Sequence, residues 1–146
     1  MPVIRITKEF NFEMAHALVG HDGPCKNIHG HSYKFHVTVK GEVKNGSEDS
    51  DEGMVVDFTV IKNIVQKLIV NEYDHSLVLW DKMNIVKENL NFMNKLILVP
   101  FNPTCENLLI HYVELIKKEL PSNLKLEHLL LRETPSSYAE WYQSDN

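Results

Sequence analysis

The sequence lacks several features that identify particular classes of protein. Its 146 residues contain only two cysteines, Cys25 and Cys105, and nothing marks them as a disulfide pair, so a reducing cytoplasm is the expected compartment. No apolar run approaches the roughly 20 residues that a membrane-spanning helix needs. The N-terminus has neither the basic start nor the long apolar centre of a signal peptide. We therefore expect no membrane partner.

Basic clusters are also missing. The formal net charge is -5 at pH 7 and no run of lysine and arginine offsets it, which argues against nucleic acid as a partner. There is no glycine-rich dinucleotide fingerprint, so neither a nicotinamide nor a flavin cofactor is expected. The length suits one domain with a modest core, which we place over residues 1–146.

What the sequence does contain is a dense group of metal-binding side chains in residues 25–31, Cys-Lys-Asn-Ile-His-Gly-His. His29 and His31 are two residues apart, so on an extended backbone both rings point to the same face. Gly30 between them has no side chain and lets the backbone approach closely. Two ring nitrogens on one face supply two of the ligands that a metal site needs. Three protein ligands with an open fourth position make a catalytic zinc site.

A third ligand has to come from another part of the chain. His16 continues the parity of Phe10 and Phe12 in an alternating run, so it can emerge at the end of that strand on the apolar side. His21, in a loop that contains glycine and proline, is its rival. His36 falls on the opposite face from the His-Gly-His pair, and we do not expect it to bind the metal.

Hydrophobic periodicity predicts an α+β chain. We expect N-caps at Asp57 and Thr104, and the segment 81–94 is mixed and could be helical. The order of elements predicts an antiparallel sheet with helices on one face. The expected strands cover residues 3–18, 31–39, 53–57, 95–101, 124–134 and 138–142, and the expected helices run from Phe58 to residues 71–75 and from Thr104 to the residue before Pro121.

Acidic side chains occur at three further places of interest. In a loop Asp74 could orient His75, although on its own such a pair is more often simply a polar helix end. Glu106 lies in the first turn of a predicted helix, where a negative charge suits the helix dipole. Glu133 ends a strand face that the alternation extends from Glu127 through two leucines, so its carboxylate lies either at the rim or is held for a ligand.

Taken together, these motifs resemble the 6-pyruvoyl tetrahydropterin synthase and 6-carboxytetrahydropterin synthase superfamily. The resemblance covers nearly the whole chain, and several ordered motifs with compatible spacing are far more specific than any single one. The motifs are Phe12-Glu13-Met14-Ala15-His16, Cys25-x-x-x-His29-Gly30-His31, Gly53-Met54-Val55-Val56-Asp57-Phe58, Asp74-His75, Pro103-Thr104-Cys105-Glu106-Asn107 and Arg132-Glu133-Thr134.

The resemblance implies a T-fold, which is a four-stranded antiparallel sheet with two helices on one face. Members of the superfamily join the sheets of three subunits into a barrel, and two barrels commonly stack as a homohexamer. Their active sites lie where subunits meet. We therefore expect a homo-oligomer, a trimer or a hexamer, whose other partner is a small-molecule pterin triphosphate.

The resemblance also implies the roles of eight residues. Zinc (Zn2+) can bind the vicinal hydroxyls of the substrate side chain and acidify them, and a thiolate near a dication has a lowered pKa. The implied roles are metal ligand for His16, His29 and His31, nucleophile or general base for Cys25, proton relay for Asp74 and His75, pterin anchor for Glu133, and a further site-lining acid for Glu106.

The spacing of the cysteine motif bears on the product. Three residues separate Cys25 from His29 and Ser32 follows the last histidine, as in bacterial 6-carboxytetrahydropterin synthases of the queuosine (7-deazaguanine) pathway. The alternative is 6-pyruvoyl-tetrahydropterin synthase of the tetrahydrobiopterin pathway. A non-catalytic, zinc-holding binding protein is disfavoured, because binding alone needs no thiol beside the metal. The link over residues 76–102 is long for a bacterial member and could extend the sheet rim or reshape the pocket mouth.

Overall fold

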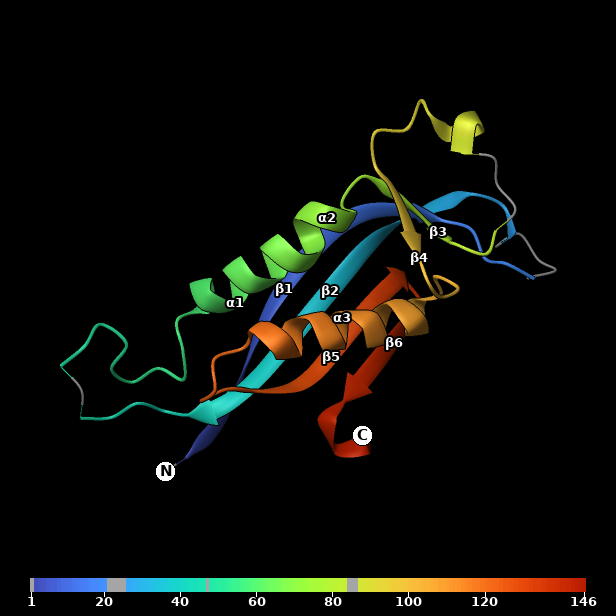
Figure 1. The fold of residues 1–146 in the computed structure, drawn as a ribbon. Helices are drawn as coiled ribbons and strands as arrows, with labels where there is room; N and C mark the ends of the chain where they lie inside the picture. The colour runs from blue at the N-terminus through green and yellow to red at the C-terminus, as the bar shows by residue number, and fades with distance from the viewer. Residues whose placement is uncertain (1, 21–25, 47, 84–86) are drawn as a thin grey trace.

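A computed structural model describes residues 2–20, 26–46, 48–83 and 87–146. Its helices lie on one face of a single sheet (Figure 1). The strands are β1 (Val3–His16), β2 (His29–Glu42), β3 (Ser76–Trp80), β4 (Leu96–Val99), β5 (Lys125–Thr134) and β6 (Ser137–Tyr142). The helices are α1 (Phe58–Val65), a π-helix (Gln66–Val70), α2 (Asn71–Tyr73), α3 (Cys105–Glu119) and 3-10 turns at Lys87–Leu90 and Gln143–Asp145.

The sheet has six strands in the order β4-β3-β1-β2-β5-β6. Strands β1, β2, β5 and β6 are consecutive neighbours and pair antiparallel, as the four-stranded expectation requires. The expectation was nevertheless wrong for the whole sheet, because β3 and β4 join it in parallel at the edge of β1. The long link over residues 76–102 therefore extends the sheet, and Figure 1 shows residues 87–95, just before β4, projecting beyond its end.

Strand β3 has apolar neighbours on both faces, which is why its sequence does not alternate. Val78 packs into the main core on the helix side. Leu77 and Leu79 form a second, smaller cluster with Ala17, against which residues of the 81–96 segment pack. Residues 81–94 were predicted to be mixed and helical in part, and the described part contains one 3-10 turn.

Two helix starts and one strand test the local predictions. Asp57 caps α1, because its Oδ1 accepts hydrogen bonds from the Thr59 backbone N–H at 2.8 Å and from the Thr59 hydroxyl at 2.7 Å. Thr104 caps α3 through the N–H of Asn107 at 3.1 Å. The predicted strand at residues 53–57 is wrong, because this segment makes ladder-like backbone bonds only to Lys44 and then turns into α1.

The main core lies between the sheet and the helices. Alternate residues of β1 and β2 face it, as period-two alternation predicts. Phe12 stacks on Tyr33 with ring centroids 5.3 Å apart, and Tyr112 of α3 meets Phe12 edge-on at 6.4 Å. These aromatic contacts continue to the end of the β1–β2 pair, so the last residues of both strands are held by a packed core.

Strand β5 contains two β-bulges, and the first changes where an acid points. The first lies between the pairs Thr38–His128 and Val39–Leu126, so Glu127 is an extra residue. Glu127 lies 2.6 Å from both Arg5 and Lys40, on the face of the sheet opposite the α-helices, which we call the helix-free face. The prediction that Glu127 shares a face with the inward leucines was therefore wrong. The second bulge lies between Arg132 and Thr134 and contains Glu133.

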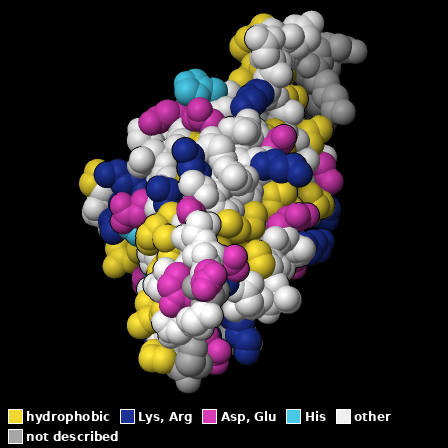
Figure 2. Space-filling view, turned by 90° about the vertical axis from the view of Figure 1, so that its left-hand side faces the viewer, with side chains coloured by type: hydrophobic (Ala, Val, Ile, Leu, Met, Phe, Trp, Pro, Cys, Tyr) yellow, Lys and Arg dark blue, Asp and Glu magenta, His cyan; other side chains and the backbone are white. Residues whose placement is uncertain are grey.

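The surface carries charges of both signs. Figure 2 shows lysine and arginine side chains interspersed with aspartate and glutamate on the face it presents, with no large area of one sign. Among the described residues, no helix combines the length and the apolar character needed to cross a bilayer.

Candidate metal centre

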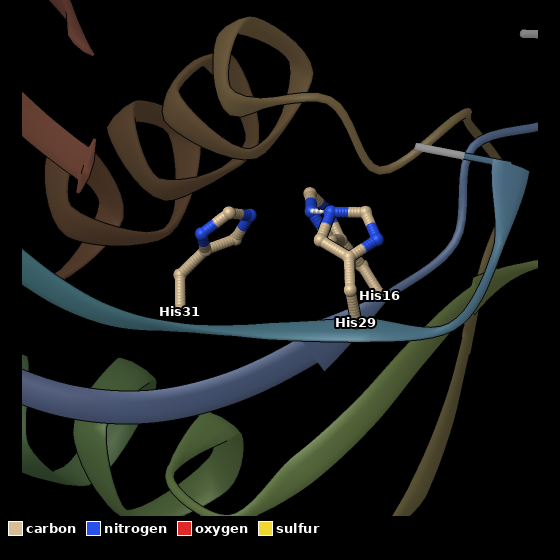
Figure 3. Close-up of side chains that lie close together, drawn as sticks. All are labelled: His16, His29 and His31. Carbon is tan, nitrogen blue, oxygen red and sulfur yellow. Dashed lines mark hydrogen bonds between the residues drawn. The ribbon is translucent and has the colours of Figure 1, made fainter. Parts of the chain in front are cut away.

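Three histidines meet where β1 ends and β2 begins. His16 is the last residue of β1 and pairs in register with His29, the first residue of β2, while His31 pairs with Met14. One ring nitrogen of each histidine lies within 4.8 Å of the other two. Figure 3 shows the three rings side by side above the ends of the two strands. The sequence predicted these three residues as one ligand set, and the fold brings them together.

The hydrogen bonds of two rings decide which nitrogen faces the centre. His16 Nδ1 lies 2.7 Å from the carbonyl oxygen of Pro103, and His29 Nδ1 lies 2.7 Å from that of Asn27. A carbonyl only accepts, so each Nδ1 carries the proton and each Nε2 presents a lone pair. The two Nε2 atoms are 3.0 Å apart. Two lone pairs at that distance repel one another unless a cation lies between them.

This donor set fits zinc. Neutral imidazoles held by backbone carbonyls are typical zinc ligands, and Zn–N bonds of about 2.0–2.1 Å place tetrahedral ligand atoms roughly 3.4 Å apart. Burial lowers the pKa of His16, which is 1% exposed, and also that of His31. The neutral form is the one that binds metal. The three histidines therefore could hold a zinc ion if ring nitrogens that are now up to 4.8 Å apart moved closer to the tetrahedral spacing.

Glu133 lies beside the three histidines. Its side chain, which is 24% exposed, continues the inward parity of Leu129 and Leu131 to the helix side, where Oε1 is 3.4 Å from His16 Nε2 and 3.6 Å from His31 Nε2. The Tyr33 hydroxyl donates a hydrogen bond to the same oxygen at 3.3 Å. Burial, followed by the Glu133 charge, raises the pKa of Tyr33, so its hydroxyl keeps the proton.

The start of α3 forms the wall next to His16. The Pro103 carbonyl fixes the His16 ring, and the Cys105 thiol donates to the Leu131 carbonyl at 3.3 Å. Burial raises the pKa of Cys105 to about 12, so this thiol is not a ready nucleophile. Glu106 is exposed in the first turn of α3 and makes no hydrogen bond or ion pair with the three histidines among the described residues.

Asp74 and His75 are held against the backbone of β1. Asp74 Oδ1 accepts from the Glu13 N–H at 2.8 Å, and the His75 N–H donates to the Glu13 carbonyl at 2.6 Å. Asp74 Oδ2 lies 3.0 Å from His75 Nδ1. Burial opposes ionisation of Asp74, but its bonds from Glu13 and His75 outweigh it and lower its pKa. The His75 side chain is 77% exposed, and its φ of 60° is unusual for a residue with a side chain.

A shallow cavity of about 370 Å³ lies beside His75. Residues 13–15 and 30–32, where β1 and β2 pair, form its floor, and Met93 of the 76–102 link lines it. The Ser32 hydroxyl donates to Glu13 there at 2.7 Å, and both side chains have the parity of the helix-free face. The Asp74–His75 pair therefore opens toward the helix-free face, whereas the three histidines open toward the helix face.

Two predicted candidates, Cys25 and His21, lie outside the described residues. His36 lies on the helix-free face, where its ring is 3.4 Å from Glu9. Sequence reasoning missed Tyr33, although its parity matches that of His29 and His31 and was a usable signal. It also missed the backbone carbonyls of Asn27 and Pro103, which accept hydrogen bonds from two of the histidine rings. A sequence offers no signal for these contacts, because every residue has a carbonyl.

Comparisons with known proteins agree on one family. The family model described as 6-pyruvoyl tetrahydropterin synthase matches residues 5–144. A Haemophilus influenzae protein named 6-carboxy-5,6,7,8-tetrahydropterin synthase is 36% identical, over 97% of this chain and 100% of its own. A Rickettsia typhi protein of the same name is 32% identical, over 94% and 99%. The solved 6-pyruvoyl tetrahydropterin synthase of Caenorhabditis elegans is 26% identical, with a TM-score of 0.69 over 97% and 96%.

Proposed function

Because this chain belongs to the 6-pyruvoyl tetrahydropterin synthase family, we propose that it is a zinc-dependent 6-carboxy-5,6,7,8-tetrahydropterin synthase. It would convert 7,8-dihydroneopterin triphosphate to 6-carboxytetrahydropterin, acetaldehyde and triphosphate in the cytoplasm, on the route to queuosine and other 7-deazaguanines. The relatives named for this reaction at 36% and 32% identity support the product assignment.

The observation that carries the proposal is the set of three clustered histidines with a carboxylate beside it. Zinc bound by His16, His29 and His31 would supply Lewis acidity toward the side-chain hydroxyls of the substrate. Glu133 is 3.4 Å from His16, so a pterin that donates its amino and ring N–H groups to this carboxylate would place its C6 side chain next to the metal ligands.

Proton transfer falls to the remaining candidates. Cys25, which precedes His29 by four residues, is proposed as the base that takes the proton from the first side-chain carbon. His75 is proposed to relay protons through Nε2, because its Nδ1 is held by Asp74 at 3.0 Å. Glu106 is proposed as a further acid at the rim of the site, near the start of α3.

The placement of these groups supports a site shared between subunits. In one chain the Asp74–His75 pair and the three histidines open toward opposite faces of the sheet, so both sets can reach one substrate only if a second copy supplies one of them. The sheet offers edges for such an assembly. In the described residues β3 covers β1 only at Met14–His16, and β6 pairs only with β5. We therefore propose a homo-oligomer, a trimer or a hexamer.

The experiment that tests the reaction is product analysis. Zinc-loaded protein is incubated with 7,8-dihydroneopterin triphosphate, the pterin product is identified by mass spectrometry, and acetaldehyde is assayed in parallel. His29→Ala protein provides the control for the zinc requirement. We expect 6-carboxytetrahydropterin with stoichiometric acetaldehyde.

The alternative product would point to a different reaction of the same family. A 6-pyruvoyl product without acetaldehyde would make this chain a 6-pyruvoyl-tetrahydropterin synthase, a reading that the 26% identical Caenorhabditis elegans structure favours. It would also direct attention to Met93, which lines the cavity beside His75. Binding of the substrate without any turnover would support a pterin-binding protein instead.

A further inference from the structure

We propose that Tyr33 is a positioning residue whose buried hydroxyl orients the Glu133 carboxylate for the pterin. The inference rests on the proposed function, because it takes Glu133 as the group that accepts hydrogen bonds from the pterin. Tyr33 itself would touch neither the substrate nor the metal. It would act through Glu133, to whose Oε1 its hydroxyl donates at 3.3 Å.

Tyr33 is placed for this role by the same alternation that places the metal ligands. It follows His31 by two residues on β2, so its ring lies on the helix face. The residue is 0% exposed, and its ring stacks on Phe12 with an interplanar angle of 11°. It also meets the rings of His31 and His16 edge-on, at centroid distances of 5.5 and 6.3 Å. The ring therefore has almost no freedom to move.

Packing alone does not require a hydroxyl at this position. Phe35, the next inward residue of β2, is equally buried and packs edge-on against Tyr112 with an unsubstituted ring. Burial of a phenolic hydroxyl is unfavourable unless the group finds a hydrogen-bond partner. The partner of the Tyr33 hydroxyl is Glu133. A phenylalanine would fill the same space. The hydroxyl of Tyr33 contributes only through its hydrogen bond to the Glu133 carboxylate.

The other close neighbours of Glu133 cannot take over this role. The proton of the neutral His16 ring is on Nδ1, where it is donated to Pro103, so its Nε2 has none to give Glu133 at 3.4 Å. His31 Nε2 is 3.6 Å away, which is too far for a hydrogen bond. Metal binding would use lone pairs of these rings and add no donor. In the part of the chain that the structure describes, Tyr33 is thus the side chain that donates to Glu133.

Restraint of Glu133 matters because a glutamate side chain has many rotamers. Ordering such a side chain on binding costs free energy, and a carboxylate that is already held loses less. The bond from Tyr33 uses one acceptor position of the carboxylate and leaves the others for the ligand. This effect is equal in the ground state and the transition state, so it changes affinity and KM rather than kcat.

The test compares two buried tyrosines that differ in what their hydroxyl touches. Tyr33→Phe removes the hydroxyl at Glu133 and keeps the ring on Phe12. Tyr112→Phe is the matched control, because Tyr112 is also 0% exposed and packs on Phe12, but its hydroxyl lies 4.0 Å from the Met14 sulfur. For each zinc-loaded protein we would measure the Kd of unsubstituted pterin by fluorescence quenching, the zinc content, and kcat and KM.

We expect Tyr33→Phe to weaken pterin binding and raise KM roughly tenfold, which corresponds to the cost of ordering one glutamate side chain on binding. Zinc content and kcat should stay as in the wild type, and Tyr112→Phe should leave the pterin Kd unchanged. In a Glu133→Ala background, Tyr33→Phe should have little further effect on the pterin Kd, because its route to the ligand is gone.

Three results would overturn the inference: an unchanged pterin Kd in Tyr33→Phe, a loss of zinc that accompanies the weaker binding, or an equal effect of Tyr33→Phe in both backgrounds. The proposed function has a separate point of failure. Wild-type protein that binds pterin and forms neither product would overturn the reaction, while the two Kd values would still decide the role of Tyr33.

Discussion

The two groups of candidate residues at the end of the sheet differ in how they are held. The metal centre is built from one buried ring, His16, and two half-buried ones, and backbone carbonyls of Asn27 and Pro103 fix two of the three. The Asp74–His75 pair is held equally well at its backbone, by Glu13, but its imidazole is 77% exposed. The histidines of the metal centre pack within their own chain. The His75 ring, in contrast, is open to solvent although its backbone is fixed. The difference is consistent with the proposal that one chain completes the metal centre and that a second copy would complete the His75 site.

The largest effect should follow removal of a metal ligand. We expect His29→Ala to lose bound zinc and, with it, turnover, because two ring nitrogens hold zinc far more weakly than three. Metal analysis after dialysis measures this loss. His36→Ala is the control, since His36 lies on the helix-free face beside Glu9 and should keep both zinc and activity. Full zinc stoichiometry in His29→Ala would contradict the ligand set.

Removal of the exposed ring should spare the metal. We expect His75→Ala to retain zinc and to lose roughly 10²- to 10⁴-fold in kcat, the usual contribution of a group that transfers protons. Steady-state kinetics together with metal analysis separates the two effects. Loss of zinc in this variant would remove the distinction between the two groups of residues.

The same two variants can test whether the site is shared between subunits. If His75 of one subunit serves the metal centre of another, an oligomer reassembled from equal amounts of His29→Ala and His75→Ala chains regains activity. About a quarter of its sites would combine two intact partners in a random cyclic assembly. Activity of the mixture no higher than that of the separate variants would contradict a shared site.

A smaller effect should follow from loosening the wall of the metal centre. Thr104→Ala removes the N-cap of α3 next to the Pro103 carbonyl, so we expect a loss of about 1 kcal/mol in the free energy of unfolding and roughly tenfold weaker zinc binding. Asp57→Ala removes the equivalent cap of α1 and is the matched control. It should be destabilised to a similar extent with unchanged zinc affinity, and chemical denaturation with zinc titration measures both quantities.

The mildest perturbation is a change of pH on metal-free protein. Burial lowers the folded-state pKa of His16 and His31 below the ordinary value of 6.5. On acidification the unfolded chain therefore takes up protons before the folded one, and stability falls as the pH drops through 6.5. We expect a lower melting temperature at pH 5.5 than at pH 7.5. A melting temperature at pH 5.5 that equals or exceeds the one at pH 7.5 would contradict lowered pKa values for these two histidines.

Much of the metal centre was predictable from the sequence, because side-chain parity is a local property. The two-residue spacing of His29 and His31 and the run that ends at His16 fixed the face of each ring before the strands were paired. The register that sets His16 opposite His29 was not predictable, since it depends on how two strands fourteen residues long align. The carbonyl of Pro103 comes from a segment 87 residues away.

The wrong predictions concern residues where pairing between distant segments overrides the local sequence pattern. Residues 53–57 have strand-like composition but no partner strand, so they form a turn and a cap. Residues 76–80 find β1 and β4 on either side and become an inner strand. Glu127 was assigned to the wrong face because an inserted residue reverses parity, and a single sequence carries no mark of where an insertion in the ladder occurs.

The two bulges of β5 have a consequence for the shape of the sheet, besides the effect of the first one on the direction of the Glu127 carboxylate. An extra residue on one strand bends that strand and increases its local twist. With one bulge opposite Thr38 and Val39 and another at Glu133, β5 is bent at both ends of its length. Sheets that curl into closed cylinders depend on such bends, because flat sheets do not close. Deletion of Glu127 would thus straighten the curvature by which neighbouring sheets could meet.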